Sequence, residues 1–283
     1  MDTFSLATIV KRTKRQPRTI IPIRPIKAQA TQATNLYQSA FRPVVQAWEA
    51  ALPAILAEYE RTLAQMTTDS PADVEARIGQ AETEAQSIVL RVSIALERWA
   101  AVVERWHRRR WAANVLSATN VSLDTLIGPA DVRETIQVAL ARNVGLVKSV
   151  SDGTRRRIEA AVFNGFTTRK PSREIAKELR EAVGIERRRA LRIASNETTT
   201  LAAELNQERR RQAGIDTWQW IHSSKRHPRP EHEARDGFLY SENAERHGKE
   251  YQGKRIRKPP QRDDWPGVPI YCGCTERSIL ILE

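Results

Sequence analysis

Cysteine is scarce in this sequence: only Cys272 and Cys274 are present, separated by a single residue. Two cysteines cannot form a disulfide framework, and side chains at positions i and i+2 of an extended chain share a face without a natural bridging geometry. The scarcity therefore indicates a reducing compartment. It also leaves both thiols available as metal ligands or as small buried side chains.

Long apolar runs are also lacking. No stretch approaches the about 20 apolar residues that cross a bilayer as a helix. The basic N-terminus is not followed by the apolar core and small-residue cleavage site of a secretory signal. We therefore expect no membrane partner and no secretory signal.

Acidic residues are outnumbered: 46 Lys and Arg stand against 34 Asp and Glu, a formal net charge of +12. The excess is uneven, because residues 1–47 hold eight basic residues and one acidic residue, whereas residues 48–150 are slightly acidic. Such a charge favours an anionic partner, either nucleic acid or an acidic protein surface. The 283 residues, of which 40% are hydrophobic, suffice for one large domain or two with a real core.

Residues 1–34 lack a helical or strand period, and we interpret them as an extended basic N-terminal arm. An isoleucine-rich segment, residues 20–26, is interrupted by prolines, which fix φ and remove backbone donors. We expect the arm to be dispensable for folding and to become ordered on a partner. Its candidate contact residues are basic: Lys11, Arg12, Lys14, Arg15 and Arg18.

A long helical region is predicted for residues 35–128. Apolar residues recur at helical spacing over residues 36–66, where Pro43 and Pro53 should kink or divide the helix, and again from about residue 71 to residue 116. Helices of this length should pack as a hairpin or against neighbouring subunits. The candidate stripe for self-association contains Trp48, Trp99 and Trp106, and internal packing of the hairpin is the alternative.

Arginine and tryptophan are interleaved at residues 105–111 of this region. The stretch could be a nucleic-acid stripe, but we favour a helix whose tryptophans are buried and whose arginines are solvated or paired. His107 alone does not argue for a ligand.

Residues 129–213 are predicted to form further helices with short connections. Their expected ranges are 130–147, 154–163, 171–183 and 186–212, with breaks at residues 151–153, 164–165 and 184, where glycines occur. Basic residues between Arg155 and Arg211 should form a surface that faces an anionic environment.

After Gly214 the apolar period changes. Residues 217–221 alternate like a half-buried strand, and residues 238–240 and 278–282 are further strand candidates. Prolines and glycines between them predict loops. The predicted fold class is therefore α+β and predominantly helical: a long N-terminal helical hairpin, a helical middle, and a small loop-rich C-terminal β-sheet at residues 214–283.

Potential ligands gather in this last part, since four of the five histidines and both cysteines fall between His222 and Cys274. Four segments, taken in order, resemble the phage Mu protein F-like family of minor head proteins. They are Asn143–Val150, similar to Asn-x-x-Leu-Ile-Lys-Ser-Ile; Ala190–Thr198, similar to a helix carrying Ala-Arg-Thr-Glu; Trp220 with Arg229–Gly237, similar to a strand and an Arg-x-x-His-x-x-x-Asp-Gly turn; and Pro266-Gly267 with Cys272–Thr275, similar to Pro-x-x-Cys-Arg-Cys-Thr.

The resemblance implies a head-morphogenesis domain at residues 129–283, whose structural motif residues are Glu197, Trp220, Arg229, Asp236 and Gly237. It implies a minor capsid protein that attaches to the portal on the inside of the head, near packaged double-stranded DNA, and that acts in head assembly and in DNA packaging or ejection. The implied partners are the portal protein, the major capsid protein and, without sequence readout, the DNA. The implied location is the virion, with the host cytoplasm during assembly, and no enzyme activity or catalytic residue is implied.

One position departs from the family's pattern. Many relatives have Cys-x-x-Cys before the Asp-Gly turn, and these cysteines could hold zinc together with the later Cys-x-Cys. Here the two places are Arg229 and His232. Two interpretations stay open: His232, Cys272 and Cys274 bind a structural zinc ion, or the region is a metal-free knot in which Arg229 bonds an acidic group or the last carbonyls.

Two other function classes are weaker alternatives. A metal-dependent nuclease would use the histidines and acidic residues around residues 227–236, but a recognisable second half of a nuclease motif is lacking. A non-specific DNA-binding regulator would use the basic arm, although no helix-turn-helix or zinc-finger spacing supports it.

Overall fold

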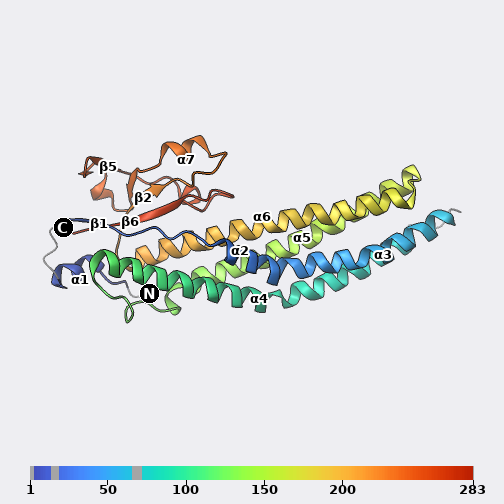
Figure 1. The fold of residues 1–283 in the computed structure, drawn as a ribbon, viewed down its shortest axis with the longest axis horizontal. Helices are drawn as coiled ribbons and strands as arrows, with labels where there is room; N and C mark the ends of the chain where they lie inside the picture. Colours follow the sequence, from blue (N-terminus) through green and yellow to red (C-terminus); the bar gives the residue numbers. More distant parts are fainter. Residues whose placement is uncertain (1–2, 14–18, 66–71, 283) are drawn as a thin grey trace. The chain divides into compact units, whose positions relative to one another are not determined.

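The computed structural model describes residues 3–13, 19–65 and 72–282, and the fold is α+β and mostly helical, as predicted (Figure 1). The long helices are α3 (Arg42–Ala64), α4 (Ala72–Thr119), α5 (Arg133–Thr168) and α6 (Ser172–Gln212). The short helices are α1 (Leu6–Thr13), α2 (Ala30–Leu36), η1 (Tyr37–Phe41), η2 (Ala130–Val132), α7 (Pro230–Ala234), η3 (Ala244–Arg246) and η4 (Arg262–Asp264). The strands are β1 (Ile20–Pro22), β2 (Thr217–Ile221), β3 (Leu239–Ser241), β4 (Glu250–Tyr251), β5 (Lys254–Arg257) and β6 (Thr275–Ile281).

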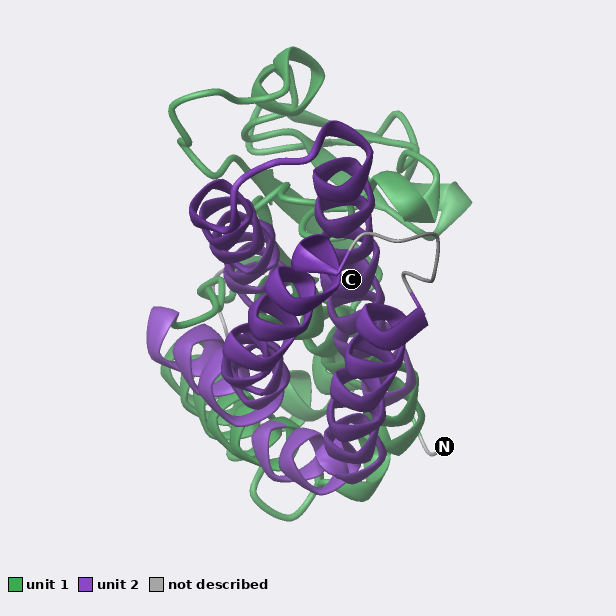
Figure 2. Ribbon diagram, turned by 90° about the vertical axis from the view of Figure 1, so that its right-hand side faces the viewer, with its two compact units in different colours: residues 1–29, 100–139, 196–283 green, residues 30–99, 140–195 purple. Residues whose placement is uncertain are grey.

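The chain divides into two compact units, each assembled from separated segments (Figure 2). Unit 1 comprises residues 1–29, 100–139 and 196–283, and unit 2 comprises residues 30–99 and 140–195. The predicted division of the sequence at residues 35 and 129 stays a prediction.

Unit 2 is helical. Its α3 and the first part of α4 form the predicted hairpin, joined by ion pairs such as Arg61 to Asp73 at 2.7 Å. Two of the three candidate self-association tryptophans are buried within this unit: the Nε1 of Trp48 donates to Ser151 Oγ at 3.0 Å, and that of Trp99 donates to the carbonyl of Gln32 at 3.1 Å. The alternative of internal packing therefore holds for Trp48 and Trp99.

The predicted breaks in the middle of the chain are wrong, because α5 and α6 are continuous. At two of the three glycine positions the residue serves close helix packing instead. A Cβ at Gly153 would lie 2.8 Å from the Glu186 side chain, and one at Gly165 would lie 2.4 Å from Ile175. Pro53 likewise lies inside α3 without ending it.

The interpretation of residues 1–34 as an extended arm without regular structure is also wrong. Residues 6–13 form α1 and residues 20–22 form β1, which pairs with β6. The side chains of Leu6, Val10 and Ile23 are fully buried in the core of unit 1. The short apolar spacing of this segment was insufficient to predict a helix, but tertiary contacts stabilise it.

Unit 1 contains a six-stranded sheet in the order β1-β6-β2-β3-β5-β4. The long strand β6 pairs antiparallel with both β1 and β2, whereas β3 and β5 are parallel. Alternation along β2 and β3 sends Trp218, Trp220 and Tyr240 to one face, where they pack with Trp265. The three predicted strands are confirmed, and β1, β4 and β5 were not predicted.

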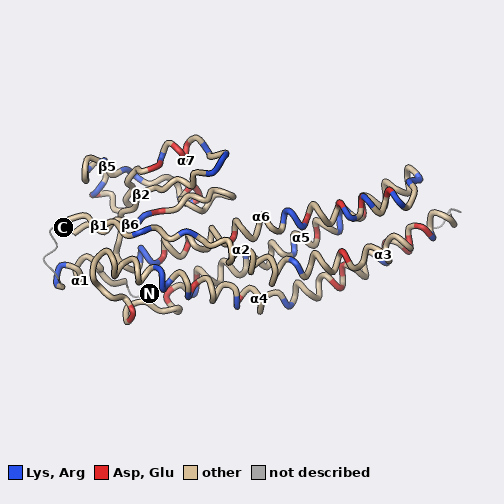
Figure 3. The backbone as a smooth tube through the Cα atoms, viewed as in Figure 1, with Lys and Arg blue, Asp and Glu red and all other residues tan. Residues whose placement is uncertain are grey.

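Basic and acidic residues alternate along α6 (Figure 3), and Arg155 and Arg157 of α5 form ion pairs with Glu159 and Glu186, so the expected basic surface between Arg155 and Arg211 is interrupted by acidic residues. Two of its arginines are not on the surface at all. Arg209 bonds Glu104 at 2.8 Å, Arg210 bonds Glu276 at 3.1 Å, and both guanidinium groups are buried in unit 1. The free-energy cost of burying each arginine is offset by the attraction of its carboxylate partner.

Candidate functional site

His232 is placed by the short helix α7, which begins after the extended residue Arg229 with Pro230 in its first turn. The backbone N–H of His232 donates to the carbonyl of Arg229 at 3.0 Å. Only 2% of the residue is exposed. The helix thus holds the imidazole inside unit 1.

The two cysteines lie in the loop that leads into β6. The loop needs unusual backbone angles, because φ is +60° at Tyr271 and +70° at Gly273. A side chain at Gly273 would be strained, and its Cβ would also lie 2.5 Å from Cε of Lys225. Gly273 therefore allows both thiols to turn to the same side.

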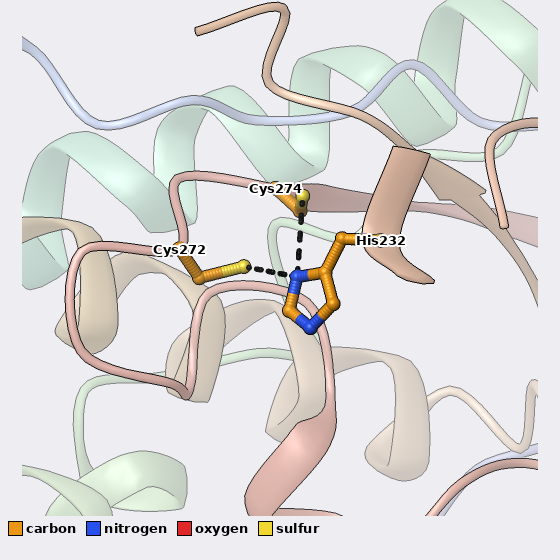
Figure 4. A group of neighbouring side chains, drawn as sticks. All are labelled: His232, Cys272 and Cys274. Carbon is orange, nitrogen blue, oxygen red and sulfur yellow. Dashed lines mark hydrogen bonds between the residues drawn. The ribbon is translucent and has the colours of Figure 1, made fainter. Parts of the chain in front are cut away.

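His232, Cys272 and Cys274 form a buried cluster, shown in Figure 4. The imidazole Nδ1 lies 3.2 Å from Cys272 Sγ and 3.9 Å from Cys274 Sγ, and the three potential ligand atoms all lie within 4.8 Å of one another. The predicted site residues are thus brought together from α7 and from the loop before β6.

Asp264, which the sequence did not single out, fixes the orientation of the imidazole. Its Oδ1 lies 2.9 Å from His232 Nε2, and its Oδ2 accepts from Arg235 at 2.5 Å. Burial alone would raise the pKa of Asp264, but the hydrogen bonds from Arg235 and His232 lower it below the usual value. The ionised carboxylate assigns the proton to Nε2 and turns the lone pair of Nδ1 toward the sulfur atoms.

The two thiols influence each other. The hydrogen bond from the Cys274 thiol lowers the pKa of Cys272 to about 5, while the same interaction raises the pKa of Cys274. One thiolate is therefore available at neutral pH, and the thiolate is the form that binds metals.

This donor set fits a zinc ion. Zinc prefers thiolate and imidazole ligands, and a ligating histidine usually donates its other ring N–H to a carboxylate, as His232 does to Asp264. Cys272 and Cys274 would supply two sulfur ligands and His232 one nitrogen. Arg229, the residue that departs from the expected family pattern, donates to the carbonyl of Ile270 at 3.0 Å.

Aromatic rings enclose the cluster. The ring of Trp220 meets that of His232 edge-on, with centroids 5.0 Å apart, and the guanidinium of Arg235 lies over Trp220 at 5.1 Å. Trp218 and Trp265 complete the apolar surroundings with ring centroids 5.7 Å apart. Such walls keep water from the sulfur atoms.

The remaining motif residues hold the backbone around the cluster. Asp236 Oδ1 accepts from the N–H of His222 at 2.8 Å. Gly237 has φ of +77°, a backbone conformation that favours glycine, and its N–H donates to the carbonyl of Trp220 at 2.9 Å. Both residues therefore connect α7 to β2.

The motif helix contacts the cysteine loop. Glu197 is buried in α6, and the neighbouring Asn196 accepts from the N–H of Tyr271 at 2.6 Å. At Gly267, where φ is +83°, a Cβ would lie 2.5 Å from Cβ of Ala203. Segments from α6, β2, α7 and the loop at residues 266–275 thus assemble one structure within unit 1.

The predicted basic contact residues are only partly covered by the structure. Lys11 and Arg12 are exposed in the last turn of α1. Lys14, Arg15 and Arg18 lie outside the described residues. Their contact with an anionic partner stays a prediction.

Residues 155–277 match the family described as "Phage Mu protein F like protein". This part of the chain is therefore similar to the phage Mu protein F-like family, which confirms the resemblance drawn from the three motif segments inside it; the segment Asn143–Val150 precedes the match. The family suggests a bacteriophage head-morphogenesis protein, associated with the capsid and structural rather than enzymatic.

A similar protein of Haemophilus influenzae (strain ATCC 51907 / DSM 11121 / KW20 / Rd), described as an uncharacterized protein, is 23% identical over 170 residues. The match covers 60% of this chain and 35% of the relative's length. No solved structure matches the chain. Among the described residues, no helix is long and apolar enough to span a membrane.

Proposed function

We propose that this chain is a minor capsid protein that bridges the portal and the inner capsid wall during head assembly. The observation that carries the proposal is the family match over residues 155–277, whose motif segments meet around one buried cluster. The portal protein and the major capsid protein would be its partners. It would assemble in the host cytoplasm and remain inside the head of the virion.

Packaged double-stranded DNA would be the third partner. The net charge of +12 supports non-specific affinity for phosphate, which carries no base information. The protein would act close to the DNA in packaging or ejection.

Heads assembled without this chain test the proposal. A phage in which the gene carries a stop codon should still form shells, but these should retain less DNA or be less infectious. A copy of the gene supplied in trans is the control and should restore both properties. Fully infectious particles from the mutant would contradict the proposal.

We also propose that the cluster of His232, Cys272 and Cys274 holds a structural zinc ion in this region. Two cysteine sulfur atoms and an imidazole nitrogen support it, and a water molecule or a further ligand would complete four-coordination. Elemental analysis of purified protein should give one zinc per chain. Folded protein without zinc would favour the metal-free knot.

Enzyme activity is not part of the proposed function. Glu231, Glu233 and His227, on which a nuclease would rely, are exposed, and His232 is directed at sulfur atoms rather than at a carboxylate-bound cation. Incubation with linear DNA and magnesium, manganese or zinc should leave the DNA intact. Cleavage that a His232→Ala variant loses would establish the nuclease alternative.

A further inference from the structure

Two apolar residues protrude from unit 1 immediately before the cysteine cluster. Ile270 is 67% exposed and Tyr271 is 46% exposed. Tyr271 also has φ of +60°, a conformation that a bulky side chain rarely adopts and that costs free energy. We refer to this pair as the knob.

Three hydrogen bonds from outside the loop hold the knob in place. Asn196 of α6 accepts from the N–H of Tyr271 at 2.6 Å. Lys225 donates to the carbonyl of Tyr271 at 2.7 Å, and Arg229 donates to that of Ile270 at 3.0 Å. The unusual backbone is therefore fixed by its surroundings, and an apolar pair is held rigidly in solvent.

The knob is bordered by positive charge. Lys225 and Arg229 reach it directly, and Arg226, between them in the sequence, is exposed. Lys225 and Arg229 donate to backbone carbonyls in these bonds, so the bonds do not neutralise their charges. A rigid tyrosine with a cationic border is typical of a residue that anchors a protein interface.

Unit 2 carries a surface with the opposite properties. A cavity of about 800 Å³, which we call the groove, has an apolar lining that includes Ile78, Val162 and Phe166. Phe163 stands at its edge and is 71% exposed. The residues lining the groove are Glu75, Ile78, Arg155, Glu159, Ala160, Val162, Phe163, Phe166 and Thr167.

The charge around the groove is negative. Arg155 is bonded by two carboxylates, those of Glu82 at 2.7 Å and Glu159 at 2.8 Å. Glu75 adds a third carboxylate to the lining. One cation among three carboxylates leaves a rim that attracts cations and repels the phosphates of nucleic acid.

We propose that the knob of one copy of this chain docks into the groove of a second copy. Ile270 and Tyr271 would enter the apolar lining, and the cations beside them would face Glu75 and the carboxylates on Arg155. The contact is head-to-tail, because each copy offers one knob and one groove. Such contacts generate rings when the rotation closes and filaments when it does not. The inference is independent of the portal and of the proposed function.

Sedimentation velocity of the full chain over a wide concentration range tests the contact. Wild-type protein should associate into dimers and larger species. The knob variant Ile270→Ser/Tyr271→Asn and the groove variant Phe163→Ser should each weaken association about tenfold or more. Asparagine tolerates a positive φ, and Phe163 is largely exposed, so both variants should fold, which circular dichroism checks. Leu90→Ser, at a residue that is 81% exposed and outside both surfaces, is the matched control and should behave as wild type.

Mixing the two variants gives the sharpest result. The knob variant retains an intact groove and the groove variant an intact knob, so an equimolar mixture should form a one-to-one dimer that grows no further. A mixture that stays monomeric would overturn the head-to-tail geometry. Wild-type protein that stays monomeric, or variants that associate like wild type, would overturn the contact itself.

A charge exchange provides a second test. Arg226→Glu and Glu75→Arg should each weaken association, and the double variant should recover at least part of the loss because the attraction is restored with reversed signs. Failure of the double variant to recover any association would contradict the proposed pairing of the two rims.

Discussion

Asp264 shows how one side chain outside the predicted site can control it. The carboxylate accepts from His232 and Arg235 and thereby orients the imidazole toward the two thiols. The three candidate ligands, His232, Cys272 and Cys274, are recognisable in the sequence from their chemistry and from the family motif. The sequence did not single out Asp264, because the residue lies in the short helix η4, 32 positions from His232, and no local pattern predicts that the two meet.

Replacement of this carboxylate should weaken metal binding. Asp264→Asn removes the charge that fixes the histidine, and loss of such a partner typically costs about 10- to 100-fold in metal affinity. Competition with a chromogenic chelator measures the zinc affinity. Asp263→Asn is the matched control, since Asp263 is an exposed neighbour in the same short helix and should leave the affinity unchanged. Equal affinities of the two variants would contradict the assigned role of Asp264.

His107 should make the stability of the protein sensitive to mild acid. Burial lowers the pKa of His107 to about 4, despite the hydrogen bond with Asn206 at 3.0 Å. Protonation therefore favours the unfolded chain, so this contribution is present above pH 6.5 and is lost as the pH falls toward 4. The loss should approach about 3 kcal/mol.

Urea denaturation between pH 7 and pH 4 measures this effect. His107→Gln should reduce the pH dependence of the free energy of unfolding within this window, whereas His227→Gln, at an exposed histidine, should not. If the free energy of unfolding of the His107→Gln variant changes with pH as that of the wild type does, a group other than His107 causes the pH dependence.

At the scale of elements, the sequence predicted the existence and type of most long helices and of three strands. It failed where a local signal competed with tertiary contacts. The pattern around Gly153 and Gly165 is locally a helix end, but these glycines instead allow a close approach to Glu186 and Ile175. Residues 1–34 lack a sustained period, yet Ile23 is fully buried against distant parts of unit 1. Neither contact can be inferred from spacing along the chain.

Replacement by alanine should have opposite effects on stability at two glycines of α5. At Gly165 a methyl group meets Ile175 and the hydroxyl of Tyr59 at 2.9 Å, so Gly165→Ala should destabilise unit 2 by about 1–3 kcal/mol. A Cβ added at Gly145 would have no atom of another part of the protein within 4 Å. Gly145→Ala should therefore stabilise the helix by up to about 1 kcal/mol. Chemical denaturation measures the free energy of unfolding of both variants. A stabilising effect of Gly165→Ala would show that a glycine at this position is not needed for the contact of α5 with α6 and α3.

The N-terminal residues should be required for folding, contrary to the expectation of a dispensable arm. Ile23→Ala removes a fully buried side chain and should cost about 2–5 kcal/mol. Ile9→Ala, at a partly buried position of α1, should cost less. Wild-type stability of the Ile23 variant would restore the view that this segment is an arm for partners.

At the scale of the whole molecule, composition predicted the kind of partner but not how the charge is arranged. The net charge is +12, yet several arginines of α5 and α6 form ion pairs with carboxylates, and Arg209 and Arg210 are buried. Counting charges cannot distinguish a solvated arginine from one that joins α6 to β6. Affinity for DNA should therefore be weaker than the net charge alone suggests.

The proposed role of this chain as a minor capsid protein within the head can be tested on purified particles. Quantitative mass spectrometry of purified procapsids and mature virions, with the major capsid protein as the internal standard, tests it most directly. The chain should be present in both particles at a fixed, low ratio to the major capsid protein and should be protected from added protease until the shells are opened. Absence from both particles, with the chain found free in the infected cell, would contradict the claim and favour a DNA-binding regulator.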